Sequence, residues 1–291
     1  DATGHGKLVR WLTKGRRPVR VALESTGTYS LDVALALQRT AGVAVMVANP
    51  RAVKQFTGAL MQRSKTDLTA AVALREFVQR MPFVAWTPPA EPVLALRAIA
   101  RRIAALVTER TRERNRLHAL AATAEASTVV VNDIEVNVRH LERRIELLSA
   151  QAVAHIAAHA ELQTTFARLV SVPGIATRSA VQLLPELLAL PAGMTVRQWV
   201  AHAGLDPRAH QSGTSVDRPA RISKVGNAHI RRALFMPALV AVQHNAHVRG
   251  FFDKLVHRLT ADELGFVAAN WYRRAAAAIE KHNGWVARSS G

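Results

Sequence analysis

The first ninety residues alternate short apolar runs with segments of helical spacing. Two runs rich in β-branched residues, Val19–Leu23 and Val43–Val47, predict buried strands. Residues 30–40 between them carry apolar side chains at helical spacing, and Gly42 follows as a helix stop. This order of strand, helix and strand is typical of an α/β domain with a parallel sheet.

The rest of this domain continues the alternation. Residues 65–79 have a further helical pattern, and Phe83–Trp86 predicts another short strand before a pair of prolines. We therefore predict an α/β domain over residues 1–89. The segment that opens the chain contains no convincing strand, so we expect the first strand of this domain to be missing.

Two long amphipathic helices are predicted after the proline pair, over residues 90–160. Their apolar side chains recur at spacings of three and four, in the series Leu96, Ile99, Ile103, Leu106 and the series Ile134, Val138, Leu141, Ile145, Leu148, Ala152. The pattern fits a coiled-coil hairpin that spans nucleic acid or joins protomers, and it also fits two helices packed in one bundle. Residues 161–291 are predominantly helical, with a long polar loop over residues 204–225.

The balance of charge narrows the choice of partner. The chain has 39 Lys and Arg residues against 21 Asp and Glu residues, a net charge of +18 and a sequence pI near 11.5. Such an excess on a folded chain favours a polyanion, with nucleic acid as the expected partner. A ribosomal or nucleoid packing protein would carry the same charge.

The absence of cysteine and of long apolar runs excludes further classes. Without Cys the chain has no disulfide scaffold, thiolate zinc site or Cys nucleophile, and it suits a reducing cytosolic compartment. The apolar runs are far shorter than the roughly 18 to 20 residues of a membrane span, and no secretion signal opens the chain. We expect a cytoplasmic protein with no membrane partner.

Two acidic residues lie where an α/β domain presents ligands. Glu24 directly follows the first predicted strand, and Asp67 lies at the start of a predicted helix. Each has a plain structural alternative, Glu24 as a solvated strand end and Asp67 as a helix N-cap. Together, on a basic protein, they suggest a site for Mg²⁺, which prefers oxygen ligands and serves phosphodiester chemistry.

Two other segments are candidate contacts with phosphate. Pro173 and Gly174 form a turn between predicted helices, which resembles a helix-hairpin-helix element whose backbone amides bind a phosphate. Turns of this kind between helices are also common for purely structural reasons. In the polar loop, Ser212 stands beside Gly213 with arginines around it. A serine there could attack a phosphate while guanidinium groups stabilise the charge, although most serines in such loops are turn residues.

Eight short motifs follow one another in a specific order over nearly the whole chain. They are ESTG at 24–27, NPRAVKQF at 49–56, KTD at 65–67, SVPGI at 171–175, GLDP at 204–207, QSG at 211–213, RISKVGN at 221–227 and RRAL at 231–234. This ordered set closely resembles the DEDD transposases of the insertion sequence 110 family.

The resemblance implies both an architecture and an activity. It implies an RNase-H-like (RuvC-like) domain over residues 1–89, a coiled-coil connection over residues 90–160 and a mainly helical transposase domain over residues 161–291. It also implies a bacterial or archaeal, nucleoid-associated recombinase guided by a structured bridge RNA, which pairs with donor and target DNA. The family's nucleophilic serine matches Ser212, which would hold a DNA strand as a phosphoserine, with Ser215 and Ser223 as nearby alternatives.

The hypothesis of a transposase gives roles to further residues. The expected contacts with DNA or with the charge of the transition state are Arg221, Lys224, Arg231 and Arg232, with Pro173 and Gly174 as a backbone clamp. Asn227 is expected to fix the loop. Because one domain would supply the metal and another the nucleophile, the active site is expected to form between protomers of a dimer or tetramer.

The acidic tetrad of the family carries over only in part. Glu24 matches the second acid and Asp67 the third, whereas the first belongs to the missing strand and Asp1 does not replace it. The fourth falls at position 70, where this chain has Ala70. A Mg²⁺ site would lose an oxygen ligand there, so we expect impaired activity. An engineered inactivating change and natural decay of the element both explain Ala70.

Three functions therefore stay open at this point. The first is a Mg²⁺-dependent transposase that acts through Ser212. The second is a nucleic-acid-binding scaffold without chemistry, which Ala70 and the missing strand allow. The third is a RuvC-like metal-only nuclease that uses water, and a covalent intermediate on the serine distinguishes the first function from the other two.

Overall fold

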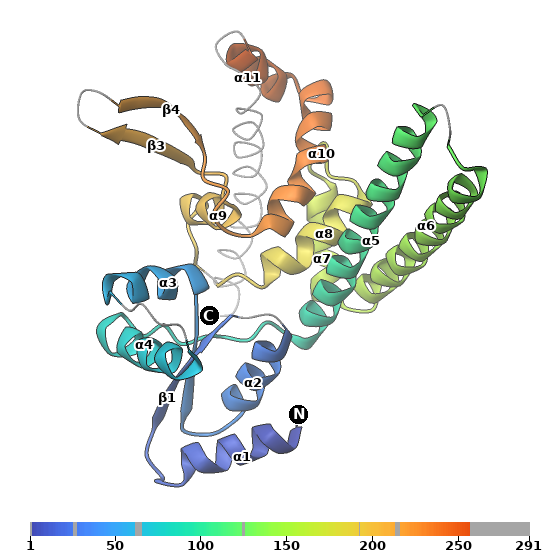
Figure 1. Cartoon of the computed structure of the whole chain (residues 1–291). Coiled ribbons are helices and arrows are strands. Elements are labelled where there is room, and N and C mark those ends of the chain that lie inside the picture. The colour runs from blue at the N-terminus through green and yellow to red at the C-terminus, as the bar shows by residue number, and fades with distance from the viewer. Residues whose placement is uncertain are drawn as a thin grey trace. The chain divides into compact units, whose positions relative to one another are not determined.

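The computed structural model of the chain describes residues 2–25, 28–61, 66–123, 126–191, 193–212 and 216–256 (Figure 1). The chain divides into two compact units, Asp1–Pro88 and Pro89–Gly291. None of the helices in the described part of the chain is long and apolar enough to cross a membrane.

The first unit is a small α/β structure. Its elements are α1 (Ala2–Thr13), β1 (Val19–Glu24), α2 (Thr28–Gln38), β2 (Val43–Ala48), α3 (Pro50–Ala59) and α4 (Asp67–Arg80). β1 and β2 are parallel neighbours, with Val19 opposite Val43 and Glu24 opposite Ala48. The strands and the helix predicted from the spacing of residues 19–47 are confirmed.

Helices pack against both faces of this sheet. Val43 and Val45 of β2 face one side and pack with Ala34 and Leu37 of α2, whereas Met46 faces the other side with residues of α3 and α4. This division follows from the alternation of side chains along a strand. Because both faces are covered, the strands are apolar at nearly every position.

The strand predicted at Phe83–Trp86 is wrong, because that segment has no regular structure. It makes a backbone hydrogen bond to the sheet, which the Trp86 N–H donates to the Val45 carbonyl oxygen at 2.7 Å. Pro82 before the segment and Pro88 after it have no N–H to donate to a longer ladder. The helical pattern predicted at residues 65–79 is confirmed as α4, while α1 and α3 were not predicted.

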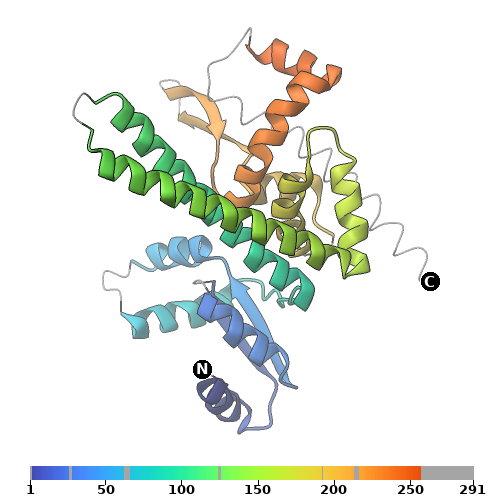
Figure 2. The ribbon, with the colours of Figure 1, turned by 90° about the vertical axis from the view of Figure 1, so that its right-hand side faces the viewer.

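The second unit is mainly helical. Its elements are α5 (Glu91–Ala121), α6 (Thr128–Ala157), α7 (Ala160–Val170), α8 (Thr177–Leu188), α9 (Val196–Ala203), β3 (Pro207–Ser212), β4 (Val216–Ile222), α10 (Ala228–His244) and α11 (Ala246–Val256). The two long helices predicted from the spacing are present as α5 and α6, which lie side by side along their length (Figures 1 and 2). Their apolar positions, among them Leu106 and Ile145, are buried.

A single hydrophobic core joins the long helices to the rest of this unit. α8 lies at its centre and packs against α5, α7 and α10. Leu183 and Leu184 of α8 are almost fully buried, as are Ile103 of α5 and Ile230 of α10. The core therefore holds α5, α8 and α10 in place, and these are the helices that surround the candidate site.

The polar loop predicted over residues 204–225 is instead an antiparallel hairpin of β3 and β4. Pro207 pairs with Ile222 and Ser212 with Val216, and the register is irregular between Arg208 and His210. The prediction failed because this segment is polar at nearly every position, so it lacks the apolar alternation by which strands are recognised. Figure 1 shows the hairpin projecting from the helices.

Candidate functional site

The two ends of the β3–β4 hairpin meet in a tightly bonded segment, Gly204–Asp206 with Ser223–Asn227, which we call the hairpin base. Gly204 ends α9 in the left-handed conformation, with φ +66°. A β-carbon there would lie 2.7 Å from the Val225 backbone, so only glycine fits. The Gly204 carbonyl oxygen accepts a bond of 3.0 Å from the Lys224 N–H.

Two hydrogen bonds between Asp206 and Ser223 hold the strands together at this point. The Ser223 hydroxyl donates to Asp206 Oδ1 at 2.5 Å. The Ser223 N–H donates to the Asp206 carbonyl oxygen at 2.9 Å. Ser223, one of the alternative nucleophiles, is therefore engaged within the hairpin base.

Asn227 joins the hairpin base to α10 and to the core. Its side-chain oxygen accepts from the N–H groups of His229 and Ile230, which caps the start of α10. Its side-chain nitrogen donates to Glu186 Oε2 at 2.7 Å, and its backbone N–H donates to the His202 carbonyl oxygen at 2.7 Å. The residue predicted to fix the loop thus contacts α8, α9 and α10.

Glu186 is the buried acid at the centre of these contacts. The residue is only 3% exposed, on a helix that is otherwise apolar at its buried positions. Besides the bond from Asn227, its carboxylate accepts from Nε of Arg101 at 2.7 Å and from Nη2 of Arg101 at 3.1 Å. Burial by itself raises the pKa of Glu186, but the hydrogen bonds from Arg101 and Asn227 and nearby positive charge outweigh it, so the pKa is lowered. The carboxylate is therefore ionised.

The sequence analysis did not single out Glu186 or Arg101. A lone Glu within the apolar run LLPELL was the available signal, because a charged residue on a buried helix face is rare unless it is paired. Its partners lie 85 and 41 residues away along the chain. No local pattern connects residues that far apart.

Two histidines near Glu186 are kept neutral. Burial lowers the pKa of His202, against the opposing effect of Glu186. Burial, followed by the charge of Arg101, lowers the pKa of His229. Both side chains are therefore uncharged near neutral pH, and the positive charge of this region resides on its arginines and lysine.

The four predicted cationic contacts lie in different environments. The Arg231 guanidinium is half-buried and donates to the Ala203 carbonyl oxygen at 2.7 Å, and burial lowers its pKa. Arg232 is exposed and donates to the Thr108 hydroxyl at 2.6 Å. Arg221 and Lys224 are exposed on and just after β4. Arg231 thus supports the hairpin base, whereas the other three present charge at the surface.

Arg208 and Arg221 lie directly opposite each other on the two strands, and both side chains are exposed. Like charges in this position destabilise a strand pair. The pair places two positive charges close together on this part of the hairpin.

Ser212 is the last residue of β3, at the end of the hairpin that lies away from the hairpin base. Ser215, the other alternative nucleophile, and Gly213 lie outside the described residues. The predicted nucleophile thus lies one strand length from the hairpin base.

Pro173 and Gly174 lie in the turn between α7 and α8. Gly174 has φ +95°, and a β-carbon there would approach the Pro237 carbonyl oxygen to 2.6 Å. Close packing against α10 therefore explains the glycine. Pro173 is exposed, and Ala176, the N-cap residue of α8, offers no side-chain hydrogen bond to the first amides of that helix.

The predicted metal ligands belong to the first unit. Glu24 is the half-buried last residue of β1, and Asp67 is the exposed first residue of α4, which packs on β1. The N-cap of α4 is Thr66, which forms a capping box with Thr69, so the alternative view of Asp67 as the N-cap is wrong. Ala70 follows on the same helix and is exposed.

The carboxylates present do not complete a metal site. Across the described ranges, no three His, Asp or Glu side chains gather closely enough to hold an ion. Ala70 has no oxygen to offer where the family motif has a carboxylate. Of the acids predicted for this site, the described residues contain two, Glu24 and Asp67, and Mg²⁺ bound by so few protein ligands would rely on waters and substrate phosphates for the rest.

Comparison with known proteins identifies two family matches. A DEDD transposase model of the insertion sequence 110 type matches residues 1–124, and the model described as "Transposase IS116/IS110/IS902 family" matches residues 167–253. The second match contains α8 to α10, the hairpin and the whole hairpin base.

Three curated relatives are similar over much of the chain. A pilin gene-inverting protein of Moraxella bovis is 27% identical over 223 residues, which are 76% of this chain and 67% of the relative. Its namesake from Moraxella lacunata is 28% identical over 67% of this chain and 59% of its own length. The transposase for insertion sequence element IS1328 of Yersinia enterocolitica is 26% identical over 74% of this chain and 70% of the relative.

Proposed function

Because the chain belongs to the insertion sequence 110 family of transposases, we propose that it cuts and rejoins the DNA strands of an insertion element and its target through Ser212. The observation that carries this proposal is the position of Ser212 at the end of a hairpin whose base is bonded to α8, α9 and α10. A nucleophile must be held in a defined place, and a surface serine on a loose loop would not be.

The proposed reaction exchanges one phosphodiester for another. The Ser212 oxygen forms a bond to phosphorus while the bond from phosphorus to a sugar oxygen breaks, and the hydroxyl proton passes overall to that sugar oxygen. The reverse step, with a sugar oxygen of another strand, releases the serine and rejoins the DNA. The exchange needs no external energy source because each broken phosphoester is replaced by another.

The surrounding cations support this chemistry. Arg208, Arg221 and Lys224 present positive charge on and beside the hairpin, where it would bind the DNA backbone and stabilise charge on the transferring phosphoryl group. Relatives named for inverting a gene also favour strand exchange over hydrolysis, because inversion requires that the cut ends be rejoined.

The first unit would supply a divalent metal site. Glu24 and Asp67 are the residues that would hold the ion, and Mg²⁺ is the ion that suits their oxygens. When bound, such an ion stabilises negative charge on the phosphoryl group. With Ala70 in place of a carboxylate, we propose that this chain binds the ion weakly and has impaired activity.

The partners follow from the same proposal. Donor and target DNA are the substrates, and a structured bridge RNA supplies sequence recognition by pairing with both. The protein would mostly read backbone shape. A dimer or tetramer would bring the metal site of residues 1–89 and the serine of residues 161–291 together across protomers, with residues 90–160 as a coiled-coil connection.

The test is the detection of a covalent adduct. The protein carrying Ala70→Asp is incubated with bridge RNA, donor DNA, target DNA and Mg²⁺, denatured, digested and mapped by mass spectrometry. We expect DNA on the peptide that holds Ser212, and none with Ser212→Ala. Cleavage without an adduct would show that water is the nucleophile, as in a metal-only nuclease. Binding without cleavage would show a scaffold.

A further inference from the structure

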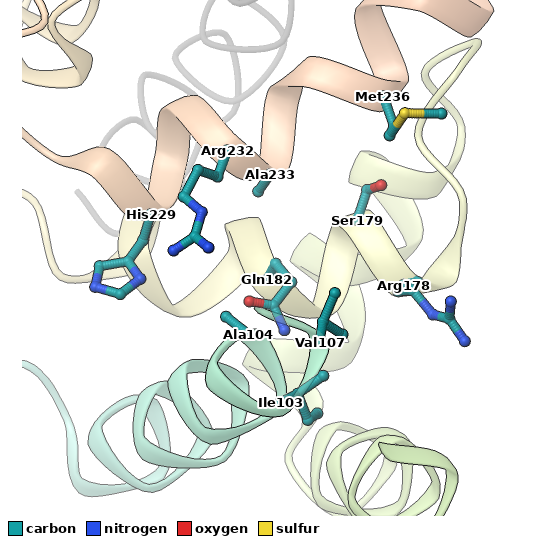
Figure 3. A pocket seen from close by; sticks show the side chains of 10 residues that line it. All are labelled: Ile103, Ala104, Val107, Arg178, Ser179, Gln182, His229, Arg232, Ala233 and Met236. Carbon is teal, nitrogen blue, oxygen red and sulfur yellow. The ribbon is translucent and has the colours of Figure 1, made fainter. Parts of the chain in front are cut away.

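A pocket of about 270 Å³ opens between α5, α8 and α10, within the second unit (Figure 3). Its apolar lining, which we call the floor, consists of Ile103, Ala104 and Val107 from α5 with Ala233 and the exposed Met236 from α10. Ile103 is buried in the core, so this floor is held by the packing of the unit. Ser212 does not line this pocket.

The rim of the pocket is polar and positively charged. Arg178, Ser179 and Gln182 contribute from α8, and His229 and Arg232 contribute from α10. Figure 3 shows Gln182 in the middle, with Arg178 and Arg232 on opposite sides. None of the described residues that line the pocket is acidic.

The charge around the pocket reinforces that of its rim. Arg97 and Arg101 act on His229, and Arg178 acts on Arg110, so further guanidinium groups lie close by. Glu186, which also acts on His229, is engaged by Arg101 and Asn227. The ligand that fits is therefore an anion that also has an apolar body.

We infer that this pocket binds one unpaired nucleotide of a single-stranded nucleic acid, with the base against the apolar floor and its phosphate between Arg178 and Arg232. An unpaired base offers flat apolar faces and polar edges, and the Gln182 amide can both donate to and accept from such an edge. Guanidinium groups suit the phosphate. A paired base is enclosed in its duplex and would not enter.

Two features prepare the pocket for this ligand. The bond from Arg232 to Thr108 holds one guanidinium at the rim before any ligand arrives, which lowers the entropic cost of binding. Burial and the nearby arginines lower the pKa of His229, so its neutral ring can accept a hydrogen bond as well as donate one. The inference rests on the proposed function only in that it takes nucleic acid as the partner.

The first experiment uses the unaltered chain without Mg²⁺, so its result does not depend on strand cutting. Single-stranded RNA containing 4-thiouridine and single-stranded DNA containing 4-thiothymidine are irradiated with the protein, and the crosslinked peptides are mapped. We expect adducts on the peptides that hold Gln182 or Met236, and the two probes distinguish RNA from DNA as the source. Adducts found exclusively on other peptides would overturn the inference while leaving the Ser212 proposal intact.

The second experiment measures affinity at one fixed salt concentration for an ordinary strand and for the same strand with abasic sites. Gln182→Leu removes the polar group at nearly constant volume, and Ala233→Met fills the pocket. We expect each to weaken the ordinary strand about tenfold and to leave the abasic strand unchanged. Equal weakening of both strands, or no weakening of either, would overturn the inference.

A matched pair of variants separates the pocket from general surface charge. Arg178→Gln and Arg197→Gln remove the same charge, but the exposed Arg197 lies on α9 and does not line the pocket. We expect Arg178→Gln to weaken binding several-fold more than Arg197→Gln. Equal losses would indicate that the phosphate is bound by the surface as a whole. Circular dichroism spectra of all variants check that the fold is retained.

Discussion

Replacement of Glu186 by glutamine tests how the hairpin base is held. The change keeps the size of the side chain but removes its charge and turns one hydrogen-bond acceptor into a donor. Arg101 and Asn227 both donate to this carboxylate. In Glu186→Gln at least one of these donors would face an NH₂ group, and the side chain is too deeply buried, at 3% exposure, for water to replace the lost bond.

The expected cost follows from the exposure of the two partners. Removal of one member of a fully buried ion pair costs about 3–5 kcal/mol. Because the Arg101 side chain is 45% exposed and can turn toward water, we place the cost at the lower end, about 3 kcal/mol. For a unit of this size that is a fall in Tm of about 6–12 °C.

Glu142→Gln is the matched control. Glu142 also pairs with an arginine, Arg114, but the two side chains are 33% and 56% exposed. An exposed pair contributes about 0–1 kcal/mol, so the fall in Tm should be about 4 °C or less. The assay is thermal unfolding followed by circular dichroism at 222 nm, at neutral pH and one salt concentration. If the two variants lost the same stability, burial of Glu186 would not be what makes its bonds important.

Three other changes give further tests. Gly174→Ala, at a positive φ and against the α10 backbone, should cost about 2–4 kcal/mol in urea unfolding, whereas Gly58→Ala, with nothing within 4 Å of the added carbon, should cost nothing. The free energy of unfolding should fall as the pH drops below 6.5. The pKa values of His202 and His229 are lowered in the folded chain, so the unfolded chain takes up protons first. A flat profile of this free energy from pH 7 to 5 would contradict the prediction. Ala70→Asp should tighten Mg²⁺ binding about tenfold or more by calorimetry, and unchanged binding would show that position 70 is not part of a metal site.

The parts of the fold that the sequence predicts are those with a local pattern. The strands β1 and β2 have apolar side chains at most positions because both faces are covered, and α5 and α6 repeat their apolar positions over many turns. The β3–β4 hairpin has no such pattern, so it was predicted as a loop. α3 was missed although Asn49 and Pro50 are a typical helix start, and the Asn49 side chain does cap it.

The ordered motifs predict which residues belong to the candidate site, but they do not predict which residues contact one another there. The motif order pointed to Asn227 and Arg231, yet their partners, Glu186 and the Ala203 carbonyl oxygen, lie on other helices. Tertiary packing also explains why positions 204 and 226 are glycines. A β-carbon on Gly226, for example, would lie 2.1 Å from the His202 carbonyl oxygen. Contacts that form only when helices pack together cannot be predicted from the spacing of residues within one segment.

Ser212 lies at the end of β3 that is distant from the hairpin base, so a small tilt at the base would be amplified at this residue. A strand rises about 3.3 Å per residue, so the six residues of β3 put that serine about 17 Å from Pro207. A tilt of about 3° at the hairpin base would move it by about 1 Å, a displacement that can cost a reaction about a hundredfold in rate. Under the proposed function, small repacking around Asn227 would therefore change the rate of strand transfer without removing a contact to DNA.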